Sequence, residues 1–425
     1  MKENTGNINS FAELGIAPNI LNVLAKLSYE QPTPIQTQAI PAAIGGKDVV
    51  GIAQTGTGKT LAFGIPVIQQ LLQKESGALV VVPTRELALQ VEEVFMKVGR
   101  PLGIRTAVLI GGMAMGPQLG ALRRDPHVII ATPGRLIDHL EQKTLSLKGV
   151  SIMVLDEADR MLDMGFWPQV KKIIAAAPTE RQTMLFSATL SREIMDLAQK
   201  HMKIPMRIEV APSGTTVERV SQEFFVVRRD DKMRLLEKIL NDYAGSVIVF
   251  VRTKHGATKA MRSIARMGHS TVDIHGDRSL GQRRQAIEGF KNGKYRVLVA
   301  TDIAARGIDV KGIELVVNYD LPTMAEDYVH RIGRTARAGA EGHAISFAMP
   351  EQRREMRSIE QLIRKTLPMS RLPELPPARS APQHEREEVV APRRYGQSRP
   401  HTGQHSGGRG FGSRSNAPRR LFRSR

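Results

Sequence analysis

Residues 53–60 form a short stretch whose side chains and small residues can bind phosphate groups. An apolar run at residues 49–52 leads into this stretch, and residues 61–72 can form a helix behind it. The backbone N–H groups of such a loop and the start of the following helix attract an anion. The amine of Lys59 can reach the β- and γ-phosphates of a nucleotide, and the hydroxyl of Thr60 can hold Mg²⁺. The candidate nucleotide-binding residues of the loop are Ala53, Gln54, Thr55, Gly56, Thr57, Gly58, Lys59 and Thr60.

The first position of this phosphate loop departs from the usual pattern. Ala53 stands where such loops ordinarily begin with Gly. The alternative interpretation is a plain strand-to-helix turn that carries a surface lysine. The strand-like and helix-like flanks favour the phosphate loop.

A second set of chemical groups follows the apolar run at residues 151–155. The order Asp156, Glu157, Ala158, Asp159 puts carboxylates at the end of a strand, where open α/β sheets bind their ligands. Asp156 would hold Mg²⁺ together with Thr60, because this ion prefers hard oxygen ligands. Glu157 would orient or deprotonate an attacking water. The alternative is an acidic first turn of a helix, where negative charge is favourable in any case.

The elements that position these groups follow from an alternation of apolar runs and helix-like stretches. Strands are expected at residues 78–82, 106–110, 128–131, 152–155 and 183–186, and again at 223–227, 247–251, 296–300, 315–318 and 343–347. Continuous apolar strands with helical spacers indicate parallel sheets covered on both faces. The small, polar residues 211–216 predict a linker. We therefore expect an α/β fold with two tandem domains, residues 1–210 and 217–367, of which only the first has a phosphate loop.

The charge and composition of the chain limit the classes of partner that it is expected to bind. The chain of 425 residues has 61 Lys and Arg against 42 Asp and Glu, a net charge of +19. This excess favours nucleic acid over a membrane, although solvated lysines without a partner would give the same sum. The absence of cysteine excludes disulfides and thiolate metal sites. Neither a secretory signal nor a run of about 20 apolar residues is visible, so we expect a soluble, cytoplasmic protein.

The last part of the chain, residues 368–425, has a different composition. A proline-rich stretch at residues 372–377 predicts a break, and residues 391–425 hold nine arginines with no lysine and no acidic residue. Such a segment cannot bury enough apolar surface to fold, so we expect a disordered tail. Tyr395, Phe411 and Phe422 lie among the arginines and can stack on bases. An auxiliary RNA-binding tail is favoured over a purely solubilising one.

The motif Asp156-Glu157-Ala158-Asp159 resembles the signature of the DEAD-box RNA helicases, and the resemblance extends from about Phe11 to Leu367. The sequences of the motifs and the tail are most similar to those of the bacterial RhlE subgroup. The resemblance implies two RecA-like domains that use ATP and Mg²⁺ and bind RNA. It also implies that Tyr29 stacks on adenine, that Gln36 pairs with the adenine edge, and that Asp309 contacts the nucleotide. Ser28 stands where the family usually has Gly.

The same resemblance implies roles for further residues. The implied catalytic residues are Lys59, Asp156, Glu157, Ser187, Thr189, His330, Arg334 and Arg337. The implied RNA contacts are Pro83, Thr84, Arg85, Gly111, Gly112, Thr132, Pro133, Gly134, Arg135, Gly276, Arg283 and Thr301. Ser187 and Thr189 resemble the element that couples hydrolysis to unwinding. Leu280 replaces the Gln that the family usually has three residues before Arg283, and a leucine side chain cannot donate a hydrogen bond.

The first domain alone lacks a cation for the charge that develops in phosphoryl transfer. Arg334 and Arg337 are three residues apart and would share a face of a helix. We expect ATP and RNA to close the second domain onto the first and bring these arginines to the γ-phosphate. Hydrolysis would then be RNA-stimulated, with local, non-processive unwinding of short duplexes or remodelling of RNA–protein complexes.

Other function classes remain open at this stage. A DNA helicase or translocase would use the same ATP chemistry, and an RNA clamp would use the same residues without separating strands. A metabolic kinase is disfavoured by the net charge of +19 and by the second domain. We expect a monomer, with ribosomal RNA and the RNA decay machinery as candidate partners.

Overall fold

The computed structural model describes residues 10–54, 56–74, 76–210, 220–305, 310, 312–336 and 342–377. Several sequence-based expectations lie outside the described residues. They concern Thr55, Asp309, Arg337, the linker at residues 211–216 and the tail from residue 378 onward. No helix in the described ranges has the length and apolar character needed to cross a membrane.

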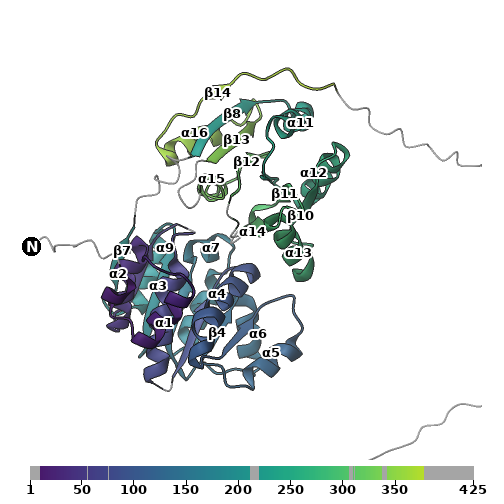
Figure 1. Cartoon of the computed structure of the whole chain (residues 1–425). Coiled ribbons are helices and arrows are strands. Elements are labelled where there is room, and N and C mark those ends of the chain that lie inside the picture. The colour runs from purple at the N-terminus through teal and green to yellow at the C-terminus, as the bar shows by residue number, and fades with distance from the viewer. Residues whose placement is uncertain are drawn as a thin grey trace, which may run out of the picture. The chain divides into compact units, whose positions relative to one another are not determined.

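The first lobe, residues 10–210, is coloured purple to teal in Figure 1. It is built on a sheet of seven strands in the order β3-β4-β2-β5-β6-β1-β7, all paired in parallel. Its strands are β1 (Val49–Ile52), β2 (Gly77–Val81), β3 (Thr106–Leu109), β4 (Val128–Ala131), β5 (Val150–Asp156), β6 (Gln182–Ser187) and β7 (Met206–Glu209). The five strands expected between residues 78 and 186 all form, with ends that shift by up to two residues.

Helices connect these strands. They are the 3₁₀ helices η1 (Phe11–Leu14) and η2 (Arg100–Leu102) and the α-helices α1 (Pro18–Lys26), α2 (Pro34–Ile44), α3 (Lys59–Gln73), α4 (Arg85–Val98), α5 (Met115–Leu122), α6 (Pro133–Glu141), α7 (Ala158–Asp163), α8 (Trp167–Ala176) and α9 (Arg192–His201). Alternate strand residues enter two apolar clusters: Val80 lies in one cluster, while Leu79 and Val81 lie in the other. Because successive side chains of a strand point to opposite faces, the sheet is buried on both sides, as its continuous apolar runs predict.

The second lobe, residues 220–377, repeats this architecture with the strand order β10-β11-β9-β12-β13-β8-β14, again in parallel. Its strands are β8 (Val220–Val226), β9 (Val247–Phe250), β10 (Thr271–Ile274), β11 (Val297–Ala300), β12 (Leu315–Asn318), β13 (Gly342–Ala348) and β14 (Met369–Ser370). Its helices are η3 (Arg229–Asp231), α11 (Lys232–Asp242), α12 (Lys254–Arg266), α13 (Leu280–Lys291), α14 (Asp302–Ala305), α15 (Ala325–Ile332) and α16 (Arg353–Ile363).

The second lobe continues past Leu367, where the sequence predicted its end. The amide of Phe224 donates to the carbonyl of Pro368 at 2.9 Å, and β14 then pairs with β8. Farther on, the guanidinium of Arg234 donates to the carbonyl of Pro376 at 2.6 Å. The proline-rich stretch looked like a break, but its carbonyl groups accept hydrogen bonds from the lobe. The compact unit therefore reaches Pro377.

Candidate functional site

The phosphate loop is folded around its own lysine. Lys59 is the first residue of α3, and its buried amine donates to the carbonyl of Ala53 at 2.9 Å. Gly58, directly before the helix, has φ of 91°, a left-handed conformation that favours glycine. The hydroxyl of Thr57 donates to the carbonyl of Gln54 at 2.7 Å. The amine thus lies across the loop, at the position where the sequence predicts phosphate groups.

Gln36 links α2 to this loop. Its side-chain oxygen accepts from the amide of Thr33 at 2.9 Å, and its side-chain nitrogen donates to the carbonyl of Gly58 at 3.0 Å. A Cβ added to Gly58 would lie 2.4 Å from that nitrogen, so a larger residue there would displace the side chain of Gln36. Tyr29, the expected stacking residue, is exposed close to the start of α2. The element predicted to read the base is therefore in direct contact with the loop predicted to hold the phosphates.

The carboxylate of Asp156 is buried at the carboxyl end of β5. Burial raises the pKa of Asp156 to about 6, and the positive charge of Lys59 opposes this rise. The amide of Glu157 donates to the carboxylate of Asp156 at 3.0 Å. A buried carboxylate beside a lysine, with the hydroxyl-bearing Thr60 at the start of α3, is an oxygen donor set that suits Mg²⁺. The residues present therefore fit this ion.

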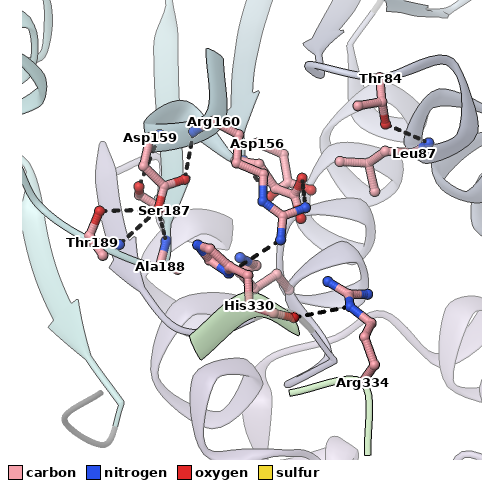
Figure 2. A network of polar contacts seen from close by, with 12 residues as sticks. Thr84, Leu87, Asp156, Asp159, Arg160, Ser187, Ala188, Thr189, His330 and Arg334 are labelled. Carbon is pink, nitrogen blue, oxygen red and sulfur yellow. Dashed lines mark hydrogen bonds and ion pairs between the residues drawn. The ribbon is translucent and has the colours of Figure 1, made fainter. Parts of the chain in front are cut away.

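The third carboxylate of the motif, that of Asp159, joins α7 to the loop after β6 (Figure 2). One of its oxygens accepts from the amides of Ala188 and Thr189 at 3.0 and 2.9 Å and from the hydroxyl of Thr189 at 3.2 Å. The amide of Asp159 donates to the hydroxyl of Ser187 at 3.2 Å. The acidic motif and the Ser187–Thr189 element, separate in the sequence, are one hydrogen-bonded unit.

Arg160 connects this hydrogen-bonded unit to the second lobe. Its guanidinium is 1% exposed and lies 2.8 Å from the carboxylate of Glu157. A second nitrogen of the same guanidinium lies 3.3 Å from Nδ1 of His330, on α15 (Figure 2). The carboxylate predicted to position water and a histidine of the other lobe thus share one buried arginine.

The structure corrects the prediction that Arg334 lies on a helix. Helix α15 ends at Ile332 and is capped by Gly333, so Arg334 lies in the turn that follows. It is buried, and its Nε donates to the carbonyl of His330 at 3.2 Å. The helix itself is held by Arg331, whose guanidinium contacts Asp302 at 2.6 and 2.8 Å. Arg334 therefore follows the C-terminal end of α15 and is not one of the residues on a face of that helix.

Residues of both lobes line one hollow next to this network. The first lobe contributes Gln54, Ala188 and Thr189, and the second contributes Glu326, Val329, His330, Gly333, Arg334 and Leu362. The phosphate loop, the Ser187–Thr189 element and the buried arginine of the second lobe therefore face a common space.

Three predicted RNA-binding segments of the first lobe meet at the carboxyl ends of β2, β3 and β4. The guanidinium of Arg85 lies against Gly112, where a Cβ would stand 2.1 Å from its Nη1. The guanidinium of Arg135 donates to the carbonyl of Met113 at 2.9 Å. Thr84 caps α4 by accepting from the amide of Leu87 at 3.2 Å. The neighbouring predicted contacts, Pro83, Gly111, Thr132, Pro133 and Gly134, belong to the same three segments.

The predicted RNA contacts of the second lobe differ in exposure. Gly276, after β10, is exposed, and Thr301 follows β11 directly and is half-buried. Arg283, on α13, is buried, with its guanidinium 2.9 Å from the carboxylate of Glu86 on α4. In this structure Arg283 therefore lies in a contact between the lobes and not on an open surface.

Two residues in this arrangement were missed by sequence reasoning. Arg160 could have been found, because it lies one helical turn after Glu157 with opposite charge. Glu86 gave no comparable signal, because its partner Arg283 is far away in the sequence.

Comparisons with known proteins agree with this geometry. The DEAD/DEAH box helicase family model matches residues 33–197, and the helicase conserved C-terminal domain model matches residues 231–339. The chain is 44% identical over 343 residues to an ATP-dependent rRNA helicase, RRP3, of Meyerozyma guilliermondii, covering 80% of this chain and 72% of that protein. The chain belongs to the DEAD-box family of ATP-dependent RNA helicases.

Further relatives of this DEAD-box protein support the assignment. It is 41% identical over 371 residues to the DEAD-box ATP-dependent RNA helicase CshA of Geobacillus kaustophilus, covering 87% of this chain and 79% of that one. The S. cerevisiae Dbp5 structure bound to RNA and ADP BeF3 superimposes with a TM-score of 0.76 at 31% identity, covering 85% of this chain and 95% of that one.

A structure of Mss116p bound to ssRNA and AMP-PNP gives a TM-score of 0.77 at 28% identity, covering 85% of this chain and 79% of that chain. The two lobes are tandem RecA-like domains, and the protein is an RNA-dependent ATPase that uses ATP and Mg²⁺.

Proposed function

We propose that this DEAD-box protein hydrolyses ATP at a site completed by both lobes, and that RNA makes the reaction fast by stabilising the closed arrangement. Lys59 binds the β- and γ-phosphates, and Glu157 orients or deprotonates the attacking water. Thr60 and Asp156 would hold Mg²⁺, which would supply positive charge beside the phosphate oxygens. Arg334, together with Arg337, supplies the cations that the transferring phosphoryl group needs.

The contact that carries this proposal is the one between Arg160 and His330. It joins the carboxylate of Glu157 in the first lobe to α15 in the second through one guanidinium, at 2.8 and 3.3 Å. Arg334 hydrogen-bonds the carbonyl of the same histidine. Any movement of the second lobe is therefore transmitted to the residue proposed to position water.

The proposed outcome for RNA is local strand separation. Predicted phosphate contacts come from both lobes, around Arg85 and Arg135 in the first and around Gly276 and Thr301 in the second. A strand held by both lobes is gripped by its backbone, which is the same for every sequence. We propose that a duplex melts only where it is gripped, without processive travel.

The names of the relatives suggest ribosomal RNA as the substrate class. Several of them are ATP-dependent rRNA helicases from fungi. We propose a role in ribosome biogenesis, with the RNA decay machinery as the alternative partner. We also propose membership of the RhlE subgroup, on the sequences of the motifs and the tail, and a cytoplasmic location. A monomer is proposed because one chain supplies both halves of the site.

A strand-displacement assay tests this function. Purified protein, ATP and a short RNA duplex with a single-stranded extension should release the shorter strand, and the matching DNA duplex should not be released. Release of the DNA strand at an equal rate would favour a DNA helicase or translocase. RNA-stimulated ATP hydrolysis without any strand release would favour the clamp.

A further inference from the structure

One face of α12 in the second lobe is a row of basic residues. His255, Lys259, Arg262 and Arg266 are spaced by four, three and four positions, so they lie along the same side of the helix. All four side chains are exposed. The helix contains no acidic residue between its first residue, Lys254, and its last. The row therefore carries a positive charge that its own helix does not offset.

This face borders a groove of about 440 Å³. The groove is lined by Lys254, His255, Thr258, Lys259, Arg262, Ser263, Arg266, His275 and Asp277. Asp277, the acidic residue among these, already pairs with Lys254 at 2.9 Å. Below the groove, buried Asp273 pairs with Arg278 at 2.6 Å. The nearby negative charges are thus occupied by other cations.

Lys259 and Arg262 have no such compensation. Within the part of the chain that the structure describes, neither side chain takes part in a hydrogen bond or an ion pair. Exposed cations without counter-charges repel one another and favour an anionic ligand. The hydroxyl of Ser263 on the same wall adds a donor that suits a phosphate oxygen, while the hydroxyl of Thr258 already donates to Asp273 at 2.8 Å.

We propose that this groove binds the phosphate backbone of RNA that extends beyond the strand gripped by the two lobes. The proposal rests on the RNA binding proposed above for Gly276. That glycine lies between His275 and Asp277, two residues of the groove wall, so the groove is continuous with the predicted RNA contacts. From His255 to Arg266 the row spans about 16 Å, at roughly 1.5 Å per helical residue, which is enough for about four phosphates.

The residues that line the groove indicate which part of an RNA strand it can recognise. Its lining includes no Phe, Tyr or Trp, and its aromatic rings are the imidazoles of exposed His255 and buried His275. A wall dominated by lysine and arginine side chains contacts mainly the phosphate backbone, which is the same for every sequence. The groove therefore adds affinity for longer RNA without adding sequence preference, and its contribution falls as salt rises.

The test compares the full-length chain with a double variant, Lys259→Gln with Arg262→Gln. The matched control is Lys171→Gln with Lys172→Gln, which removes the same charge from two exposed lysines of α8 in the first lobe. Binding is measured over a range of salt with two single strands: the shortest that fully stimulates ATP hydrolysis, and the same strand with a long extension. A further variant, Lys259→Arg with Arg262→Lys, keeps the charge.

The groove variant should bind the long strand several-fold more weakly than wild type and bind the short strand normally. For the long strand, a plot of log affinity against log salt concentration should be less steep than for wild type. The slope should differ by about 1.4, the change expected when two phosphate contacts on a single strand are lost. The charge-keeping variant and the α8 control should behave as wild type. Equal weakening for both strands, or by the control, would overturn the proposal.

Unchanged binding of the long strand would also overturn the proposal, and would leave an acidic protein partner as the occupant of the groove. The wild-type protein separates this result from a failure of the proposed function. If RNA does not stimulate its ATP hydrolysis, the proposed function fails. If RNA stimulates it and the groove variant binds both strands normally, only the groove proposal fails.

Discussion

Glu157 is held in an unusual conformation by the residues around it. Its φ of 57° and ψ of 51° lie in the left-handed region, which costs a non-glycine residue about 1 kcal/mol. Its amide donates to Asp156, and its carboxylate is paired with the buried guanidinium of Arg160. Strain of this kind persists where surrounding contacts enforce it, commonly at functional sites. The strain fixes the direction of the carboxylate that we propose positions the attacking water.

Replacing Glu157 tests its role in hydrolysis. Glu157→Gln keeps the size of the side chain but removes its negative charge and its basicity. We expect ATP binding close to wild type and a turnover number lower by about 10²–10⁴, the usual contribution of a general base. Nucleotide titration and steady-state hydrolysis measure the two quantities. Normal turnover in the variant would show that another group positions the water.

Asp156 gives a prediction on pH, because its folded and unfolded pKa values differ. Burial raises its pKa to about 6 in the folded protein, above the ordinary value of 3.8. The folded state therefore binds a proton more tightly than the unfolded state. The contribution of this group to stability is greatest at low pH and is lost as pH rises through about 6.

Asp156→Asn removes this titration. Without nucleotide, the variant should gain stability relative to wild type as pH rises from about 4 through about 6, on the order of 3 kcal/mol at neutral pH. Thermal or urea unfolding over a pH series measures the difference. A difference that stays constant across the series would contradict a raised pKa for Asp156.

At the scale of elements, α13 connects the lobes through two residues. The carboxylate of Glu86, on α4, meets the guanidinium of Arg283 at 2.9 Å, with both side chains buried. Leu280, at the start of the same helix, packs half-buried against the apolar cluster of the first lobe. The leucine thus replaces a polar side chain at a place where this chain makes an apolar contact. Both residues favour the closed arrangement.

A double-mutant cycle tests the pair between Glu86 and Arg283. Each alanine variant alone leaves one charge buried without its partner, so each should lower RNA-stimulated ATP hydrolysis. The double variant should lose less than the sum of the two single losses. Arg284→Ala is the control, since this neighbouring exposed arginine pairs with Glu288 within α13. Strictly additive losses would mean that the two residues act separately.

Much of this arrangement of helices and strands could be predicted from the sequence. The exceptions have physical reasons. Strand β1, the phosphate loop and α3 were predicted because an apolar run, small residues and a helical stretch follow one another locally. The burial of Arg283 could not be predicted, because it depends on a residue of the other lobe. The position of Arg334 was misjudged because the three-residue spacing to Arg337 fits a helical face, whereas Gly333 ends α15 before Arg334, as glycine often ends helices.

At the scale of the whole molecule, the boundary of the second lobe decides how the tail is tested. Cutting after Leu367 would remove β14 and the hydrogen bonds that Arg234 makes to the chain beyond it. A chain ending at Pro377 keeps these contacts and loses only residues 378–425.

We expect the chain ending at Pro377 to fold normally and to keep its RNA-stimulated ATP hydrolysis. Its RNA affinity should fall, and its affinity should depend less on salt, because the removed segment is rich in arginine. The chain ending at Leu367 should unfold at a lower temperature. Unchanged RNA affinity after the cut at Pro377 would show that the tail does not bind RNA.

The central claim is that RNA accelerates hydrolysis by bringing Arg334 of the second lobe to ATP held by the first. The most direct measurement is steady-state ATP turnover with and without single-stranded RNA, for wild type and for Arg334→Ala. Wild type should be stimulated strongly, by a factor on the order of 10³ if the arginine acts as arginine fingers do. The variant should bind ATP normally and show little stimulation. Equal turnover of the wild-type protein with and without RNA, or full stimulation of the variant, would contradict the claim.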